Sequence, residues 1–269
     1  MTAAEYWSGR NLKISKRVNQ PKKIKKMFRE SYKRQKSYID YLYNFTDLQN
    51  PPTRTELYKF AQFLKMKKAI KEECKTNLAQ LDKEVYKTLK KAYIETFKNT
   101  KYLFGKQPHF TVVNKKRMES VLKTSWSGEH YSKRLWKHTE KLSNTVRECV
   151  IDSIVNGKTK QECIRSVLIR NKVAYNEAQR LIQTETAYVI NKANLDTYKE
   201  ESATHVEIMA ELKARTCEDC TKRNGRRIPI EEAKIGKNIP PFHPSCHCDI
   251  LPVIEKGEEN KNAENKHKK

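Results

Sequence analysis

Residues 78–93 read LAQLDKEVYKTLKKAY, and this stretch decides the fold class. Most of its apolar residues are three or four positions apart, the spacing that gathers side chains on one face of an α-helix. They are Leu78, Leu81, Val85, Leu89, Ala92 and Tyr93. The remaining positions are rich in lysine, which suits a helix face that meets water. The stretch predicts a long amphipathic helix packed against other helices.

The same pattern extends outward in both directions. Residues 53–100 are helical by pattern, with Thr53 or Thr55 as cap and a first apolar stripe of Leu57, Phe60, Ala61 and Leu64. Residues 114–156 form helices around a turn, and Gly157 ends the second of them. Thr159 and Glu162 have the spacing of a capping box, which predicts a short helix with an apolar face ending at Leu168. A further helix is predicted over 175–200.

Composition excludes several other fold classes. Of 269 residues, 37% are hydrophobic and 33% are charged, a balance that favours long solvent-exposed helices with thin cores. Only 7 Gly and 9 Pro argue against a many-turned β-sandwich or barrel. From His205 to Leu212 apolar and polar residues alternate loosely, which favours a strand.

These patterns predict a mainly α fold, an elongated helical body followed by a small α+β module held together by zinc at the C-terminal end. We expect a basic N-terminal helical arm over residues 1–52, the helical body over 53–200, the Cys/His zinc-binding module over 201–254, and a disordered polar tail over 255–269.

The module contains a paired set of metal-ligand residues. Cys217 and Cys220 form a Cys-x-x-Cys arm, and His243 and Cys246 repeat that spacing as His-x-x-Cys. Four such ligands suit a structural, tetrahedral Zn²⁺ with no open position. Cys248 and His247 are spare candidates for the same site. The alternative is a small core of reduced cysteines without metal.

The formal net charge of +24 indicates an anionic partner: phosphate, a membrane surface or an acidic protein. Eleven Lys or Arg residues lie between Lys13 and Lys36, with one acid, Glu30. This run predicts sequence-independent contact with nucleic-acid phosphates. The residues assigned to that contact are Lys22, Lys23, Lys25, Lys26, Arg29, Lys33 and Arg34. The alternative is a solvated helix face or an anchor on an acidic partner.

No apolar run approaches the roughly 18–20 residues that span a bilayer, and no signal peptide is visible, so we expect no membrane partner and a reducing cytoplasm. Cys74, Cys149 and Cys163 lie on or near apolar helix faces and are expected to be small buried hydrophobic residues. Glu185 is expected in a polar network or a helix-packing contact, because no convergent catalytic partner accompanies it.

Three motifs resemble the phage minor head proteins of the head-morphogenesis family related to protein F of phage Mu. The first is Glu5-Tyr6-Trp7-x-x-Arg10. The second runs from Trp136 through Leu142 and Gly157 to Arg180-Leu181-Ile182-x-Thr184-Glu185, then Asn191 and Ala193. The third is Arg215-Thr216-Cys217-x-x-Cys220 with Gly225, then Pro240-Pro241-Phe242-His243-Pro244-x-Cys246-x-Cys248. The chain departs from the family at His247, where members usually have Arg.

The resemblance implies a minor capsid protein that acts in head morphogenesis and is associated with the portal. Its expected partners are the portal protein, the major capsid or scaffolding protein, and double-stranded DNA. The expected location is the virion head, and the host bacterial cytoplasm during assembly.

Two other functions compete with this interpretation. An enzyme is disfavoured, because the dense Cys/His cluster is already assigned to metal and the chain has no Glu-x-Glu pair of the kind that fused ADP-ribosyltransferase domains use. A zinc-containing DNA-binding regulatory protein is the second alternative, but no recognition helix or Cys₂His₂ spacing is visible.

Overall fold

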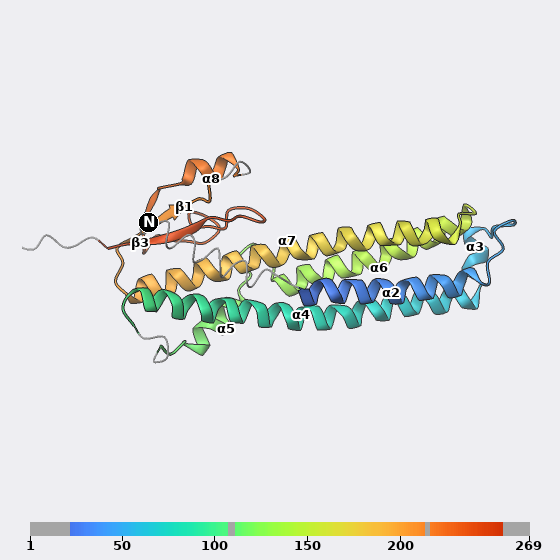
Figure 1. Ribbon diagram of the computed structural model, residues 1–269, viewed down its shortest axis with the longest axis horizontal. Helices are drawn as coiled ribbons and strands as arrows, with labels where there is room; N and C mark the ends of the chain where they lie inside the picture. The colour runs from blue at the N-terminus through green and yellow to red at the C-terminus, as the bar shows by residue number, and fades with distance from the viewer. Residues whose placement is uncertain (1–21, 107–110, 213–215, 255–269) are drawn as a thin grey trace, which may run out of the picture.

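Four long helices lie side by side along the longest axis of the computed structural model, which describes residues 22–106, 111–212 and 216–254 (Figure 1). They are α2 (Lys22–Tyr43), α4 (Ala61–Leu103), α6 (Tyr131–Val155) and α7 (Lys160–Glu200). Two short helices, α3 (Arg54–Leu57) and α5 (Lys115–Lys123), lie in the connections. The chain is therefore mainly helical, as the sequence predicted.

The core of the bundle is built from the predicted apolar faces. Leu81, Val85 and Leu89 of α4 are fully buried, where they belong to one continuous apolar cluster shared by the long helices. Helix α2 contacts α4 and α7 and contributes Ile24 and Ile39 to that cluster. The first described helix of the expected basic arm is thus packed into the bundle on its apolar side.

Helix α7 is one continuous helix of 41 residues, so the prediction of two helices separated near Leu168 was wrong. The predicted capping box is present, because Thr159 and Glu162 exchange side-chain and backbone hydrogen bonds. No Gly or Pro interrupts the chain between them and residue 200. At the expected break, Asn171 Nδ2 donates to the Val167 carbonyl at 3.0 Å and to Gln35 Oε1 at 2.8 Å. The Nδ2 group of this buried side chain therefore has two acceptors within the continuous helix and the bundle, whereas its Oδ1 has no partner.

The predicted first stripe of α4 also needs correction. Leu57 is buried, but Phe60 is 38% exposed and Leu64 is 46% exposed. The chain turns after α3, so that Leu57 and the later residues do not share one helical face. Phe63 and Met66 occupy the core in their place.

The C-terminal module is a small antiparallel sheet with one short helix, and it lies over the C-terminal end of α7 (Figure 1). Its strands are β1 (His205–Met209), β2 (Arg227–Pro229) and β3 (Asp249–Val253), in the order β2-β1-β3. Helix α8 (Glu218–Arg223) follows β1. The predicted strand at His205 is confirmed, and its Ile208 pairs with Ile250 of β3.

No helix in the described ranges is long and apolar enough to cross a membrane. The first motif, at residues 5–10, and the expected disordered tail, 255–269, lie outside the described residues.

Candidate metal centre

The Cys-x-x-Cys arm lies at the start of α8. Cys217 is the N-cap residue of that helix, and its Sγ accepts a hydrogen bond of 3.4 Å from the backbone N–H of Cys220. This single turn brings the exposed thiol of Cys217 beside the buried thiol of Cys220. The sequence spacing therefore produces a pair of sulfur atoms on one side of the loop.

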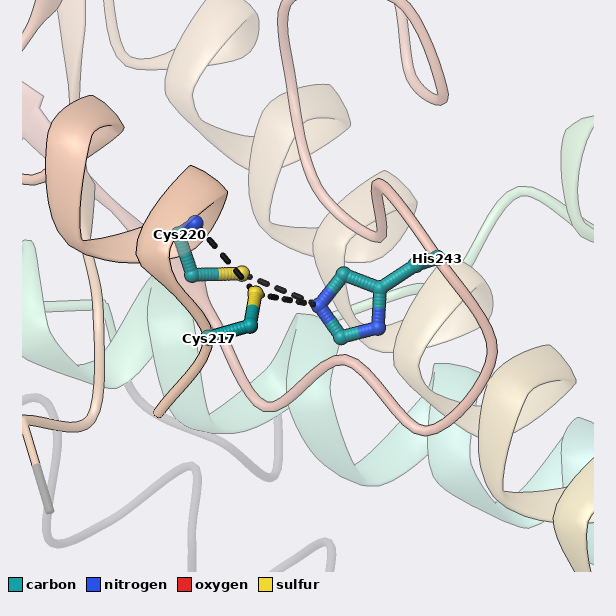
Figure 2. Close-up of side chains that lie close together, drawn as sticks. All are labelled: Cys217, Cys220 and His243. Carbon is teal, nitrogen blue, oxygen red and sulfur yellow. Dashed lines mark hydrogen bonds between the residues drawn. The ribbon is translucent and has the colours of Figure 1, made fainter. Parts of the chain in front are cut away.

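His243 faces both sulfur atoms from the opposite arm. Its Nε2 lies 3.3 Å from Cys217 Sγ and 3.1 Å from Cys220 Sγ (Figure 2). Its Nδ1 lies 2.9 Å from the Pro244 carbonyl oxygen, which can only accept a hydrogen bond. The proton of the neutral ring is therefore on Nδ1, and the lone pair of Nε2 points at the thiols. Metal-binding imidazoles are oriented in the same way by a second hydrogen bond.

Two further thiols extend the cluster on its buried side. Cys246 Sγ lies 3.8 Å from Cys220 Sγ, and Cys248 joins the same group. With Zn–S bonds of about 2.3 Å, two thiolates on one tetrahedral Zn²⁺ lie about 3.8 Å apart. The donor types and the measured spacing therefore fit a metal ion, and the cluster could hold one.

The structure brings the predicted ligands together in two overlapping groups. Cys217, Cys220 and His243 form one, and Cys220, Cys246 and Cys248 form the other, with the ligand atoms of each group within 4.8 Å of one another. His247 is exposed and belongs to neither group. The four ligands assigned from the sequence are thus divided between two groups that share Cys220, and the spare candidate Cys248 belongs to the second group.

The thiols of the buried group differ in acidity. The hydrogen bond from Cys248 lowers the pKa of Cys246 to about 5, whereas burial raises the pKa of Cys220 to about 12. The hydrogen bond to Cys246 likewise raises the pKa of Cys248. One thiolate is therefore favoured at neutral pH in the absence of a cation, and a bound cation would favour the deprotonated form of the others.

Helix α7 fixes the loop that carries His243 and Cys246. The backbone N–H of Ser245 donates to Thr184 Oγ1 at 3.0 Å, and Asn191 Nδ2 donates to the Cys248 carbonyl at 3.3 Å. Both α7 side chains are buried. The sequence patterns did not predict that Thr184 and Asn191 anchor this loop. The available signal was that both are polar residues on an otherwise apolar helix face, and buried polar groups need hydrogen-bond partners.

Glu185 forms the structural polar cluster that the sequence predicted. Its carboxylate is buried, pairs with Arg134 of α6, and accepts a 3.0 Å hydrogen bond from Trp126 Nε1. Trp126 also stacks on Tyr188 of α7, with ring centroids 5.0 Å apart. The cluster therefore fixes the α5–α6 connection against α7.

The other expected features of the sequence lie apart from the metal centre. Cys74 and Cys163 are buried as predicted, and Cys149 is half-buried. Seven basic residues assigned to nucleic acid are all exposed on α2. Three of them form ion pairs within the bundle: Lys23 with Glu84, Lys33 with Glu30, and Arg34 with Glu73. In the described ranges, no acid pairs with the remaining four, which are Lys22, Lys25, Lys26 and Arg29.

Comparison with known protein families gives a match within the C-terminal half of the chain. Residues 144–251 match a family model described as Phage Mu protein F like protein. No curated protein and no solved structure matches. The matched range begins within α6, includes all of α7 and ends in β3, so it contains the complete Cys/His cluster together with the helix that anchors it. The match confirms the resemblance drawn from the sequence motifs over residues 144–251, which are similar to the phage Mu F-like family.

Proposed function

We propose that this chain is a structural, non-catalytic minor capsid protein that acts in phage head morphogenesis. The observation that carries the proposal is the match of residues 144–251 to the phage Mu F-like family, because that range coincides with the cluster and its supporting helix. A family of head proteins suggests a location in the virion, with assembly in the host cytoplasm. Portal, major capsid or scaffolding protein is the expected kind of partner.

The metal in this proposal is a structural Zn²⁺. Cys217, Cys220, His243 and Cys246 would hold it, with Cys248 as the alternative thiol on the buried side. All the donors are Cys or His, the set that structural zinc sites use. The ion would stabilise a module whose own apolar cluster is small, since zinc binding in such modules is worth about 10–16 kcal/mol. The expected division of the chain into arm, body, zinc module and tail is part of the same proposal.

DNA contact is the second part of the proposed role. Lys22, Lys25, Lys26 and Arg29 form an exposed cationic stretch at the start of α2. They would meet phosphates without reading bases, so affinity should fall steeply as salt rises. A regulatory protein would instead keep a preference for one sequence when salt is raised. Binding of labelled duplexes of unrelated sequence across a salt series separates these two outcomes.

The assembly role is tested on particles. Procapsids and filled heads are separated on a density gradient, and the chain is quantified in each fraction with a specific antibody. Co-sedimentation at a few copies per procapsid supports the role, and cross-linking to the portal protein supports the portal-associated location. A chain that stays at the top of the gradient in every preparation contradicts the assignment.

A further inference from the structure

A groove runs along the bundle between α4 and α6. It consists of two adjoining hollows, of about 300 and 430 Å³, and both are lined by Lys75, Leu78 and Trp136. On α4 its lining extends from Lys67 to Asp82. At about 1.5 Å per residue this is a length of about 22 Å, or about four helical turns. The groove is long enough to hold a helical segment of a partner.

Trp136 is the centre of this groove. It is 50% exposed and lies where the two hollows meet. The floor beneath it is apolar, since Cys74 and Leu78 are buried members of the main core. An exposed tryptophan beside an apolar hollow is typical of a protein-binding surface, where aromatic residues contribute most of the affinity.

The rim of the groove is cationic. Lys67, Lys71 and Lys75 follow one another along α4 at four-residue intervals, so they form a row on one side. Arg147 lies on the facing side at one end, and Lys133 lies there at the other. The lining contains only two acids, Glu140 and Asp82. Lys75, Lys133 and Arg147 form ion pairs with acids just outside the lining, so Lys67 and Lys71 are the rim cations that favour an acidic partner.

We propose that this groove docks an acidic amphipathic helix from another head protein. The apolar side chains of that helix would fill the hollows beside Trp136, and its carboxylates would meet the lysine row. This is the helix-in-groove mode of recognition. Duplex DNA fits less well, because its bases are stacked inside the double helix and offer no apolar side chain to these hollows. That the partner is a head protein rests on the proposed function.

The first test compares two variants with the same change of charge. Trp136→Ala/Lys71→Glu alters the groove. Ile169→Ala/Lys172→Glu alters exposed positions on α7, where Ile169 is 51% exposed, and serves as the control. Each full-length variant replaces the wild-type chain during particle assembly, and copies per procapsid are counted. The copy number of the groove variant per procapsid should fall by about tenfold or more, because an aromatic anchor and a facing charge are both lost. The control should match the wild type.

The outcomes separate this inference from the function on which it rests. Absence of the wild-type chain from procapsids contradicts the assembly role itself. Normal incorporation of the wild type and of both variants contradicts the groove proposal but leaves the assembly role intact. An equal decrease in copies per procapsid for both variants also contradicts the groove proposal, because changes outside the groove would then have the same effect as changes within it.

A second test does not depend on the folding of a variant. A photo-crosslinking amino acid replaces Asn144, an exposed residue of the groove lining, in an otherwise unchanged chain. After irradiation of procapsids, the attached peptide is sequenced by mass spectrometry. An acidic segment with apolar residues at helical spacing supports the proposal. A cross-link to DNA, to a basic segment, or to nothing overturns it.

Discussion

The contact between Gly236 and Trp126 gives a quantitative test of how the C-terminal module is held on the bundle. Gly236 has φ +82°, and a Cβ built there would lie 3.2 and 3.3 Å from Cε3 and Cζ3 of the Trp126 ring. That ring cannot withdraw easily, because it stacks on Tyr188 and its Nε1 donates to Glu185. Gly236→Ala should therefore push the module away from the bundle or strain it in place.

The expected cost has two parts. A left-handed backbone costs a non-glycine residue about 1–2 kcal/mol. Overpacking against an immobile ring typically costs a further 1–3 kcal/mol, so the free energy of unfolding should fall by about 2–5 kcal/mol. Gly225→Ala is the matched control, because Gly225 has φ +75° but nothing lies within 4 Å of its built Cβ. It should show only the backbone part, about 1–2 kcal/mol.

Urea unfolding followed by far-UV circular dichroism measures both variants, with zinc present throughout. In a Trp126→Leu background, the excess cost of Gly236→Ala over Gly225→Ala should largely disappear, since the clashing ring is gone. If the two glycine variants lose the same stability in the wild-type background, the proposed clash between a Cβ at position 236 and the Trp126 ring is wrong.

Three further outcomes are expected. Cys220→Ser should abolish the binding of about one zinc per chain, measured by atomic absorption, whereas the exposed His247→Ala should retain it. Thr159→Ala removes the α7 capping box and should lower the free energy of unfolding by about 1 kcal/mol in urea, and an unchanged midpoint would contradict this. Burial raises the pKa of Glu200, but its bond to Lys101 helps to hold that pKa below the ordinary 4.5. A lowered pKa in the folded state means that the ionised carboxylate adds stability above pH 4.5, and that this stability is lost as the pH falls. The melting temperature of Glu200→Gln should therefore decrease less than that of the wild type between neutral and acidic pH.

Local signals in the sequence predicted local structure well. The capping box at Thr159 depends only on residues three positions apart, and the Cys-x-x-Cys turn depends on a single helical turn. The fold class followed from periodicity for the same reason. Periodicity was insufficient at Phe60 and Leu64, which have helical spacing with Leu57 but follow a turn that rotates their face toward solvent.

The remaining features depend on contacts between distant segments. Nothing near Asn171 in the sequence indicates its partner Gln35, which is 136 positions away, and this bond lies where a helix break was expected. Cys248 likewise has no spacing that separates it from His247 as a spare ligand. Only the fold decides between them, because it buries Cys248 beside Cys246 and leaves His247 exposed.

Buried polar pairs give the bundle a single register, and this links the groove to the metal centre. Tyr93 donates to Asp196 at 2.9 Å, and Thr100 donates to Asn194 at 2.8 Å, so two points along α4 are matched to two points along α7. Sliding one helix past the other by one turn would take the buried hydroxyls of Tyr93 and Thr100 away from these acceptors, at a cost of about 1–3 kcal/mol each. Apolar contacts alone would tolerate such a shift more easily, because they are not directional. Helix α4 lines the groove and α7 anchors the Cys/His loop, so the fixed register also fixes the distance between the two surfaces.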